Sequence, residues 1–82
     1  MKVTFKLFAT LMEHLPPEAD RHELPLEVDE STSAYDLIDR FNVPRELAHL
    51  VLVNGVYLQP NERELPLKEN DVLAVFPPVA GG

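Results

Sequence analysis

The chain contains no cysteine and only 3 glycines among its 82 residues. Without cysteine it can form neither a disulfide framework nor a thiolate nucleophile or a thiolate metal site. Gly55 is the only glycine before the last two residues, so there is no glycine-rich loop that could cradle nucleotide phosphates. We therefore expect no bound cofactor, and any step that consumes ATP must be carried out by another protein.

Basic side chains are also scarce, with 7 Lys and Arg against 14 Asp and Glu and a net charge of −7. A negative field repels phosphate backbones and anionic lipid, which disfavours nucleic-acid and membrane roles and favours a basic protein partner. No apolar run approaches the roughly 20 residues that span a bilayer. The segment Met1–Lys6 lacks the apolar core of a signal peptide, so we expect a cytoplasmic protein.

The residues that could bind metal or act as nucleophiles form no recognisable group. His14, His22 and His49 show no i, i+4 pairing, and we interpret them as surface residues rather than metal ligands. Residues 31–33, Ser-Thr-Ser, precede an amphipathic stripe. Capping of a helix explains them better than nucleophilic catalysis does. We predict no metal site.

The N-terminal part of the chain predicts two strands with a short helix between them. Residues 3–8 alternate, with the odd-numbered apolar side chains on one side, as in a strand with one buried face. Residues 9–15 favour a helix that a diproline ends, and the polar segment 16–23 is interpreted as an exposed loop. Residues 24–28 alternate again, and Pro25 places this second strand at a sheet edge because proline cannot donate to a ladder.

The main helix is predicted just after residues 31–33. Apolar residues recur there at the i, i+3, i+4, i+7 spacing of a helix with one buried face. They are Ala34, Leu37, Ile38 and Phe41. Asp36, Asp39 and Arg40 lie off this stripe and are expected to face water. The helix should end before Pro44, and a further short turn is expected there.

The second half of the chain predicts a tight hairpin and a final strand. The runs 50–53 and 56–58 are joined by Asn54-Gly55, the dipeptide that suits a type I′ turn, in which both central residues need a positive φ. Residues 59–70 are interpreted as a loop whose leucines, Leu65 and Leu67, anchor it to the core. Residues 72–76 are apolar throughout, the pattern of a strand covered on both faces.

Together these elements predict one α+β domain, with a mixed five-stranded sheet and the main helix packed on one face. The uniformly apolar strand 72–76 belongs in the interior of the sheet, with the strand that contains Pro25 at one edge and residues 56–58 at the other. We expect the domain to span residues 1–76 and residues 77–82 to form an extended tail.

The tail offers the one group with plausible chemistry. Pro77 and Pro78 stop the strand and stiffen the root of the tail. Small side chains then lead to Gly81 and Gly82, which lack the Cβ that would obstruct a narrow channel. We interpret the Gly82 carboxylate as the functional group. Apolar residues 76–80 would form a docking strip beside it, although Phe76 could instead simply close the core.

The order ββαβββ, the turn 53–55 and the ending Phe-Pro-Pro-Val-Ala-Gly-Gly at 76–82 resemble the MoaD/ThiS family of β-grasp, ubiquitin-like sulfur carriers. The resemblance covers the whole chain, and the ending is most similar to the small subunit of molybdopterin synthase. It implies that an E1-like enzyme uses ATP to adenylate Gly82. Sulfur then replaces the adenylate to give a thiocarboxylate, which the large subunit of the synthase would use to build molybdopterin.

Carried over residue by residue, the resemblance makes Gly82 the site of adenylation and of the thiocarboxylate, and Gly81 its companion glycine. Phe76, Pro77, Pro78, Val79 and Ala80 would match the extended segment that enters the partner's pocket. The chain would then be a carrier or co-substrate subunit without an active site of its own.

Other destinations for the activated tail stay open on the sequence. The chain could be a ubiquitin-like modifier whose activated Gly82 is attacked by a lysine, or a sulfur carrier for thiazole synthesis or tRNA thiolation. It could also be an interaction module whose tail is incidental.

Overall fold

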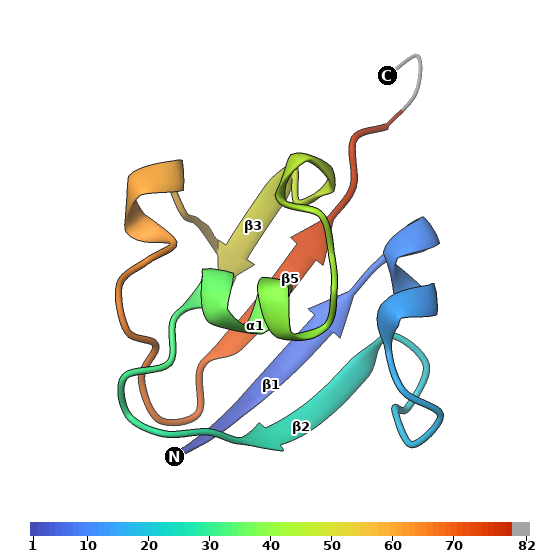
Figure 1. Cartoon of the computed structure of the whole chain (residues 1–82). Coiled ribbons are helices and arrows are strands. Elements are labelled where there is room, and N and C mark those ends of the chain that lie inside the picture. The colour runs from blue at the N-terminus through green and yellow to red at the C-terminus, as the bar shows by residue number, and fades with distance from the viewer. Residues whose placement is uncertain (80–82) are drawn as a thin grey trace.

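A mixed five-stranded sheet forms the body of the protein in a computed structural model that describes residues 1–79 (Figure 1). The strands lie in the order β2-β1-β5-β3-β4. Their bounds are β1 Lys2–Leu7, β2 Glu23–Glu27, β3 Leu50–Val53, β4 Val56–Tyr57 and β5 Val72–Phe76. The central strand β5 runs parallel to β1 and antiparallel to β3. The predicted five-stranded α+β fold is confirmed, as is the interior position of the last strand.

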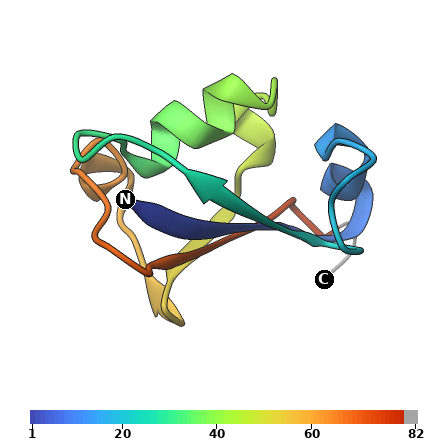
Figure 2. The same cartoon turned by 90° about the horizontal axis from the view of Figure 1, so that it is seen from below.

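One α-helix, α1 (Ala34–Arg40), crosses one face of this sheet, and Figure 2 shows the other face without a helix across it. The helix begins where the sequence predicts, because Ser33 and Asp36 form a reciprocal capping box: Asp36 N–H donates to Ser33 Oγ at 3.1 Å and Ser33 N–H donates to Asp36 Oδ2 at 2.9 Å. Short 3₁₀ helices occupy the connections. They are η1 Ala9–His14, η2 Arg45–Leu47 and η3 Pro60–Glu62.

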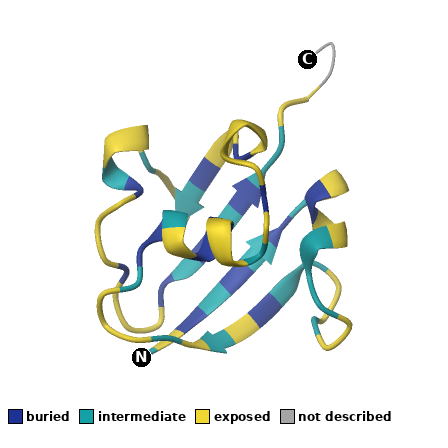
Figure 3. Ribbon diagram, viewed as in Figure 1, coloured by how far each residue is buried: buried dark blue, intermediate teal, exposed yellow. Residues whose placement is uncertain are grey.

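The hydrophobic core lies between α1 and the helix-side face of the sheet (Figure 3). The inward side chains of neighbouring strands are fully enclosed and meet the helix stripe. They include Val3, Phe5, Leu7, Leu37, Ile38, Val51, Leu73 and Val75, each at most 1% exposed. Phe5 stacks on Phe41 with ring centroids 5.1 Å apart. Burial on this face follows the predicted alternation of β1 and the predicted stripe of the helix.

The turn between β3 and β4 has the predicted conformation, with φ of 52° at Asn54 and 82° at Gly55. The Asn54 side chain also joins this turn to the start of β5. Its Nδ2 donates to Asp71 Oδ1 at 2.9 Å and its Oδ1 accepts the Val72 N–H at 2.9 Å. Asp71 Oδ2 accepts the Lys68 N–H at 2.8 Å, so Asp71 caps its own turn as well.

Two sequence-based expectations about burial are wrong. Leu67 does anchor the loop 59–70 at 6% exposed, but Leu65 is 60% exposed because it lies outside the layer between α1 and the sheet. Strand β5 is not covered on both faces. Leu73 and Val75 are buried against the helix side, whereas Val72, Ala74 and Phe76 are only half-buried, since no helix or strand among residues 1–79 covers the second face.

Candidate functional site at the end of the central strand

The residues predicted to dock follow one another out of the end of β5. Phe76 is its last residue, and Pro77 is half-buried beside it. Pro78 and Val79 are exposed, with Val79 at 75%. Figure 1 shows this segment leaving the body of the domain beyond the β5 arrowhead. The other predicted site residues, Ala80, Gly81 and Gly82, lie outside the described residues.

Backbone hydrogen bonds hold the end of β5 from both sides. The Val75 carbonyl accepts the Phe8 N–H at 3.1 Å on the β1 side, and the Phe76 carbonyl accepts the His49 N–H at 3.0 Å on the β3 side. Pro77 and Pro78 have no N–H to extend either ladder. The segment that follows is thus released from the sheet at a fixed point, directly after Phe76.

An aromatic stack surrounds this point. The Phe76 ring lies on the Phe8 ring with centroids 4.2 Å apart and 6° between the planes, and Phe8 in turn stacks on His22 at 4.7 Å and 30°. All three side chains are half-buried. Phe76 is absent from the buried core on the helix side. The alternative in which it closes that core is therefore wrong, and its docking role stays a prediction.

An apolar strip continues from this stack across the sheet face that α1 does not cover. Leu50 pairs with Phe76 and Leu52 with Ala74 in the β3–β5 ladder, which places each pair on the same side of the sheet. None of the four is fully buried, and Leu50 is 36% exposed. We call Phe8, Leu50, Leu52, Ala74 and Phe76 the open-face strip. A continuous apolar surface at the root of an exposed segment is typical of a docking site.

Two residues of this site were missed from the sequence. Phe8 is an apolar residue on the side of its strand that should face water, and that exception to the alternation was a usable signal. His22 lies in a polar loop without periodicity, so no pattern could place it. The preceding residue, Arg21, has a positive φ of 59°. This conformation is uncommon for arginine and could not be predicted from the sequence.

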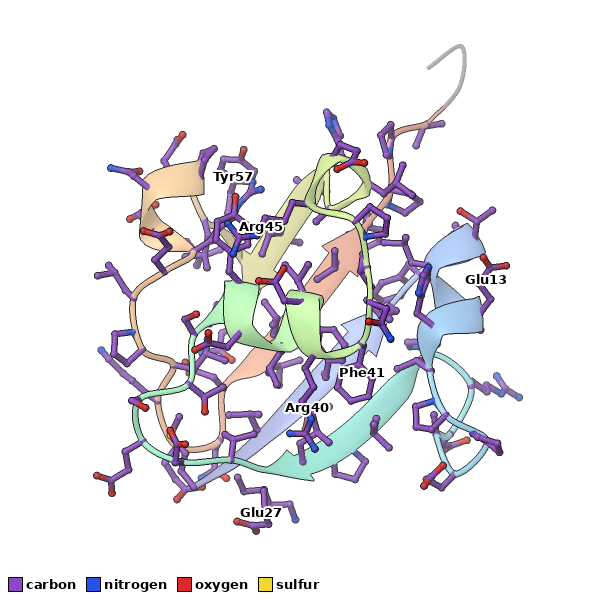
Figure 4. The ribbon with its side chains drawn as sticks, in the orientation of Figure 1. Glu13, Glu27, Arg40, Phe41, Arg45 and Tyr57 are labelled. Carbon is purple, nitrogen blue, oxygen red and sulfur yellow. The ribbon has the colours of Figure 1, made fainter. Side chains whose placement is uncertain are left out.

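The perturbed charges lie elsewhere, at the two ends of α1. A hydrogen bond from the Ser31 side chain lowers the pKa of the Asp29 carboxyl before the helix. After the helix, the Arg45 guanidinium donates to both Asp39 oxygens at 3.2 and 2.8 Å, which lowers the pKa of Asp39 and raises that of Arg45 (Figure 4). Arg45 also lies 4.0 Å above the Tyr35 ring. The Asp39–Arg45 pair fastens the following loop to the helix, whereas Asp29 and Ser31 interact within the preceding loop, and neither pair contributes a group to the open-face strip.

Residues 1–79 contain no cluster of three or more His, Cys, Asp or Glu side chains that could hold a metal ion. Among the same residues, no helix is long and apolar enough to cross a membrane.

The arrangement of one helix on a mixed five-stranded sheet is that of the β-grasp fold, and solved structures agree. SAMP1 from Haloferax volcanii is 26% identical over 100% of both chains, with a TM-score of 0.68. A candidate molybdopterin converting factor subunit 1 from Pyrococcus furiosus is 27% identical over 95% of this chain and 98% of that one, with a TM-score of 0.64. A complex of subunits 1 and 2 of the molybdopterin-converting factor from Helicobacter pylori matches over 100% of both chains at 18% identity and a TM-score of 0.59, which shows the fold alone.

The family model described as the ThiS family matches residues 5–82. The chain therefore belongs to the ThiS family, whose members and structural relatives are small sulfur carriers and ubiquitin-like modifiers rather than enzymes. No curated protein matches the chain at a significant level. The predicted family is confirmed, and the predicted β-grasp fold with it.

Proposed function

We propose that the chain is a sulfur carrier that is activated at its Gly82 carboxylate. The observation that carries the proposal is the family match, which runs through Gly81 and Gly82. The geometry supports it, because β5 is held in the middle of the sheet and releases the segment after Phe76 next to an apolar surface. A rigid root with an exposed continuation suits the delivery of a carboxylate into the active site of a partner.

The chemistry follows from the weakness of a carboxylate as an electrophile. An oxygen of the Gly82 carboxylate attacks the α-phosphorus of ATP, and pyrophosphate leaves. A hydrosulfide ion released by a sulfur donor then attacks the acyl carbon, AMP leaves with the bridging oxygen, and loss of the S–H proton gives the thiocarboxylate. The activating enzyme binds the ATP and the donor provides the sulfur. Gly81 and Gly82 can enter the narrow channel of the enzyme's active site because they have no Cβ that restricts their backbone.

We propose that the carrier donates its sulfur in molybdopterin synthesis. The P. furiosus relative is a candidate subunit 1 of molybdopterin converting factor. The H. pylori protein is solved as a complex of subunits 1 and 2 of that factor. In this proposal a large subunit covers the open-face strip and receives the tail. The acidic surface of the carrier, with its net charge of −7, speeds the encounter with a basic partner.

A second candidate is a ubiquitin-like modifier, favoured by the 26% identity to SAMP1, a small archaeal modifier protein. Activation is shared by both candidates, and the acceptor differs. In the modifier a lysine amine attacks the Gly82 acyl carbon and forms an isopeptide instead of a thiocarboxylate.

The experiment combines the chain with an E1-like enzyme, ATP and a sulfur donor, followed by intact mass measurement. A mass gain equal to the replacement of one oxygen by sulfur supports the carrier, and lysine-linked adducts in cell extract support the modifier. Two matched variants are a deletion of Gly82 and a chain with one residue added after it. Both should fold unchanged and lose activation. Full activation of the extended chain would exclude the carboxylate mechanism.

A further inference from the structure

Within residues 1–79, Arg63 is a buried cation with no acidic side chain at ion-pair distance. It is 5% exposed, and neither ion pair among the described residues includes it. Its guanidinium donates instead to neutral oxygens: Nε to the Leu58 carbonyl at 3.1 Å, Nη1 to the Ala48 carbonyl at 3.2 Å and Nη2 to the Tyr57 hydroxyl at 3.1 Å. Burying an ion is costly even when it is hydrogen-bonded, so this position calls for an explanation beyond packing.

The Ala48 carbonyl connects this cation to the root of the tail. That carbonyl and the His49 N–H belong to one peptide group, which is planar and rigid. Arg63 donates to the Ala48 oxygen of this peptide at 3.2 Å. The His49 N–H of the same peptide donates to the Phe76 carbonyl at 3.0 Å. A charged donor at one end of a peptide polarises the group and strengthens the hydrogen bond that its other end makes.

The Phe76 carbonyl is itself part of the Phe76–Pro77 peptide group, the first link of the tail. Fixing this oxygen fixes the plane of that peptide, and the plane sets the direction in which Pro77 leaves the sheet. The hydrogen-bonded chain therefore runs from Tyr57 on the edge strand β4, through Arg63 and the Ala48–His49 peptide, to the end of β5.

We propose that Arg63 is a positioning residue for the C-terminal tail, acting through the Ala48–His49 peptide on the Phe76 carbonyl. The effect of Arg63 on activation of the tail rests on the proposed function. The relay of hydrogen bonds from Arg63 through the Ala48–His49 peptide to Phe76 does not rest on it, so the relay and the effect on activation can be tested separately. The backbone carbonyl of Arg63, which accepts the Tyr35 N–H at 2.9 Å, is unaffected by a change of side chain.

The variants are Arg63→Met, which keeps most of the side-chain length without the donors, and Arg63→Lys, which keeps the charge without the planar fork. Tyr57→Phe is the matched control, because it removes one acceptor of the guanidinium and leaves the bond to Ala48 in place. The Phe8 amide is an internal reference, since it bonds the Val75 carbonyl on the other side of β5.

The first measurement is amide hydrogen exchange. In Arg63→Met the His49 amide should exchange about tenfold faster while the Phe8 amide is unchanged, as expected for local loss of a hydrogen bond. The exchange rate of the His49 amide in Arg63→Lys should lie between those of Arg63→Met and the unmodified chain. In Tyr57→Phe this rate should equal that of the unmodified chain. Equal acceleration of both amides, or none at His49, would overturn the relay. If Arg63→Met does not fold, Arg63→Lys gives the same comparison.

The second measurement is kcat/KM for adenylation by the E1-like enzyme. Arg63→Met should lower it by about tenfold, Arg63→Lys by less, and Tyr57→Phe not at all. Faster exchange at His49 with an unchanged kcat/KM would overturn the positioning role. Failure of the unmodified chain to be activated would count against the proposed function alone, because the exchange measurement stands without it.

Discussion

The two faces of β5 both consist of apolar residues, but one face is buried and the other is partly exposed. Leu73 and Val75 point toward α1 and are 0% exposed. Val72, Ala74 and Phe76 point the other way and keep part of their surface in water. Within residues 1–79 only the first face has a helix across it (Figure 2). Apolar composition alone cannot distinguish a face that the chain itself buries from one that keeps contact with water.

This difference predicts two functions for one strand. The helix side contributes stability, because every buried apolar side chain there loses its contact with water. The open-face strip stabilises the fold less and leaves apolar surface available for association at the root of the tail. Substitutions on the two faces should therefore separate folding from partner binding.

The largest expected effect is on the helix side. Leu73→Ala should lower the free energy of unfolding by about 2 to 5 kcal/mol, since it leaves a cavity in a closed core. Val72→Ala, on the opposite face of the same strand, should cost less than about 1.5 kcal/mol. Urea denaturation measures both. Equal losses would mean that the open face is as closely packed as the core.

Phe76→Ala should affect binding more than folding. The half-buried Phe76 ring contacts Phe8 at 4.2 Å between centroids on the open face, and an aromatic anchor that becomes buried in an interface contributes about 2 kcal/mol or more to affinity. Affinity for a large subunit or an activating enzyme, measured by calorimetry, should fall at least tenfold. Thr4→Ala, on the same face but outside the strip, is the control. Unchanged affinity in Phe76→Ala would remove the open-face strip from the docking surface.

Asn54→Gly tests the link between the hairpin and β5. Glycine accepts the positive φ of the turn, so the change removes only the side-chain bonds to Asp71 and Val72. The free energy of unfolding should fall by about 1 to 2 kcal/mol. Thermal denaturation measures this loss. Asn54→Asp keeps an acceptor for the Val72 N–H but sets a carboxylate against Asp71, so it should lower the free energy of unfolding by at least as much. A neutral Asn54→Gly would show that the turn alone positions the strand.

The smallest effect concerns the pair Asp39 and Arg45, whose side chains are about half exposed. The hydrogen bonds from Arg45 hold the pKa of Asp39 below its ordinary value of 3.8. A lowered pKa in the folded state contributes stability above the ordinary pKa, and this contribution is lost as the pH falls through the lower folded value. Arg45→Met should therefore flatten the loss of stability below about pH 4. Ser31→Ala, which acts on Asp29, should leave the Asp39 part of the profile unchanged.

Local rules predicted most of the architecture. Asn54-Gly55 specified its turn because two successive positive φ values are available to few other pairs, and Ser33 specified the start of α1 through its capping box. Pro25 was correctly placed in an edge strand, since its lack of an N–H restricts it there. These residues act through the backbone within a few positions, so the sequence carries their effect directly.

The parts that escaped prediction depend on contacts between distant segments. Arg63 lies between two glutamates and resembles a solvated loop residue, yet its partners are 5 to 15 positions away. The stack of Phe8 on Phe76 brings together residues from β1's end and β5's end that only the parallel pairing joins. No periodicity within a segment encodes such contacts. The roles of Gly81 and Gly82 stay predictions, which rest on the small residues after the diproline and on the family resemblance.

The position of β5 also determines how the protein responds to force. A pull on residues 77–79 along the strand axis loads the β1 and β5 ladder and the β3 and β5 ladder in shear, because β5 is hydrogen-bonded on both sides. Bonds loaded in this way must fail together, whereas a pull at the β4 edge would open its pairs one after another. A pull on residues 77–79 should therefore unfold the domain more slowly than an equal pull at the β4 edge.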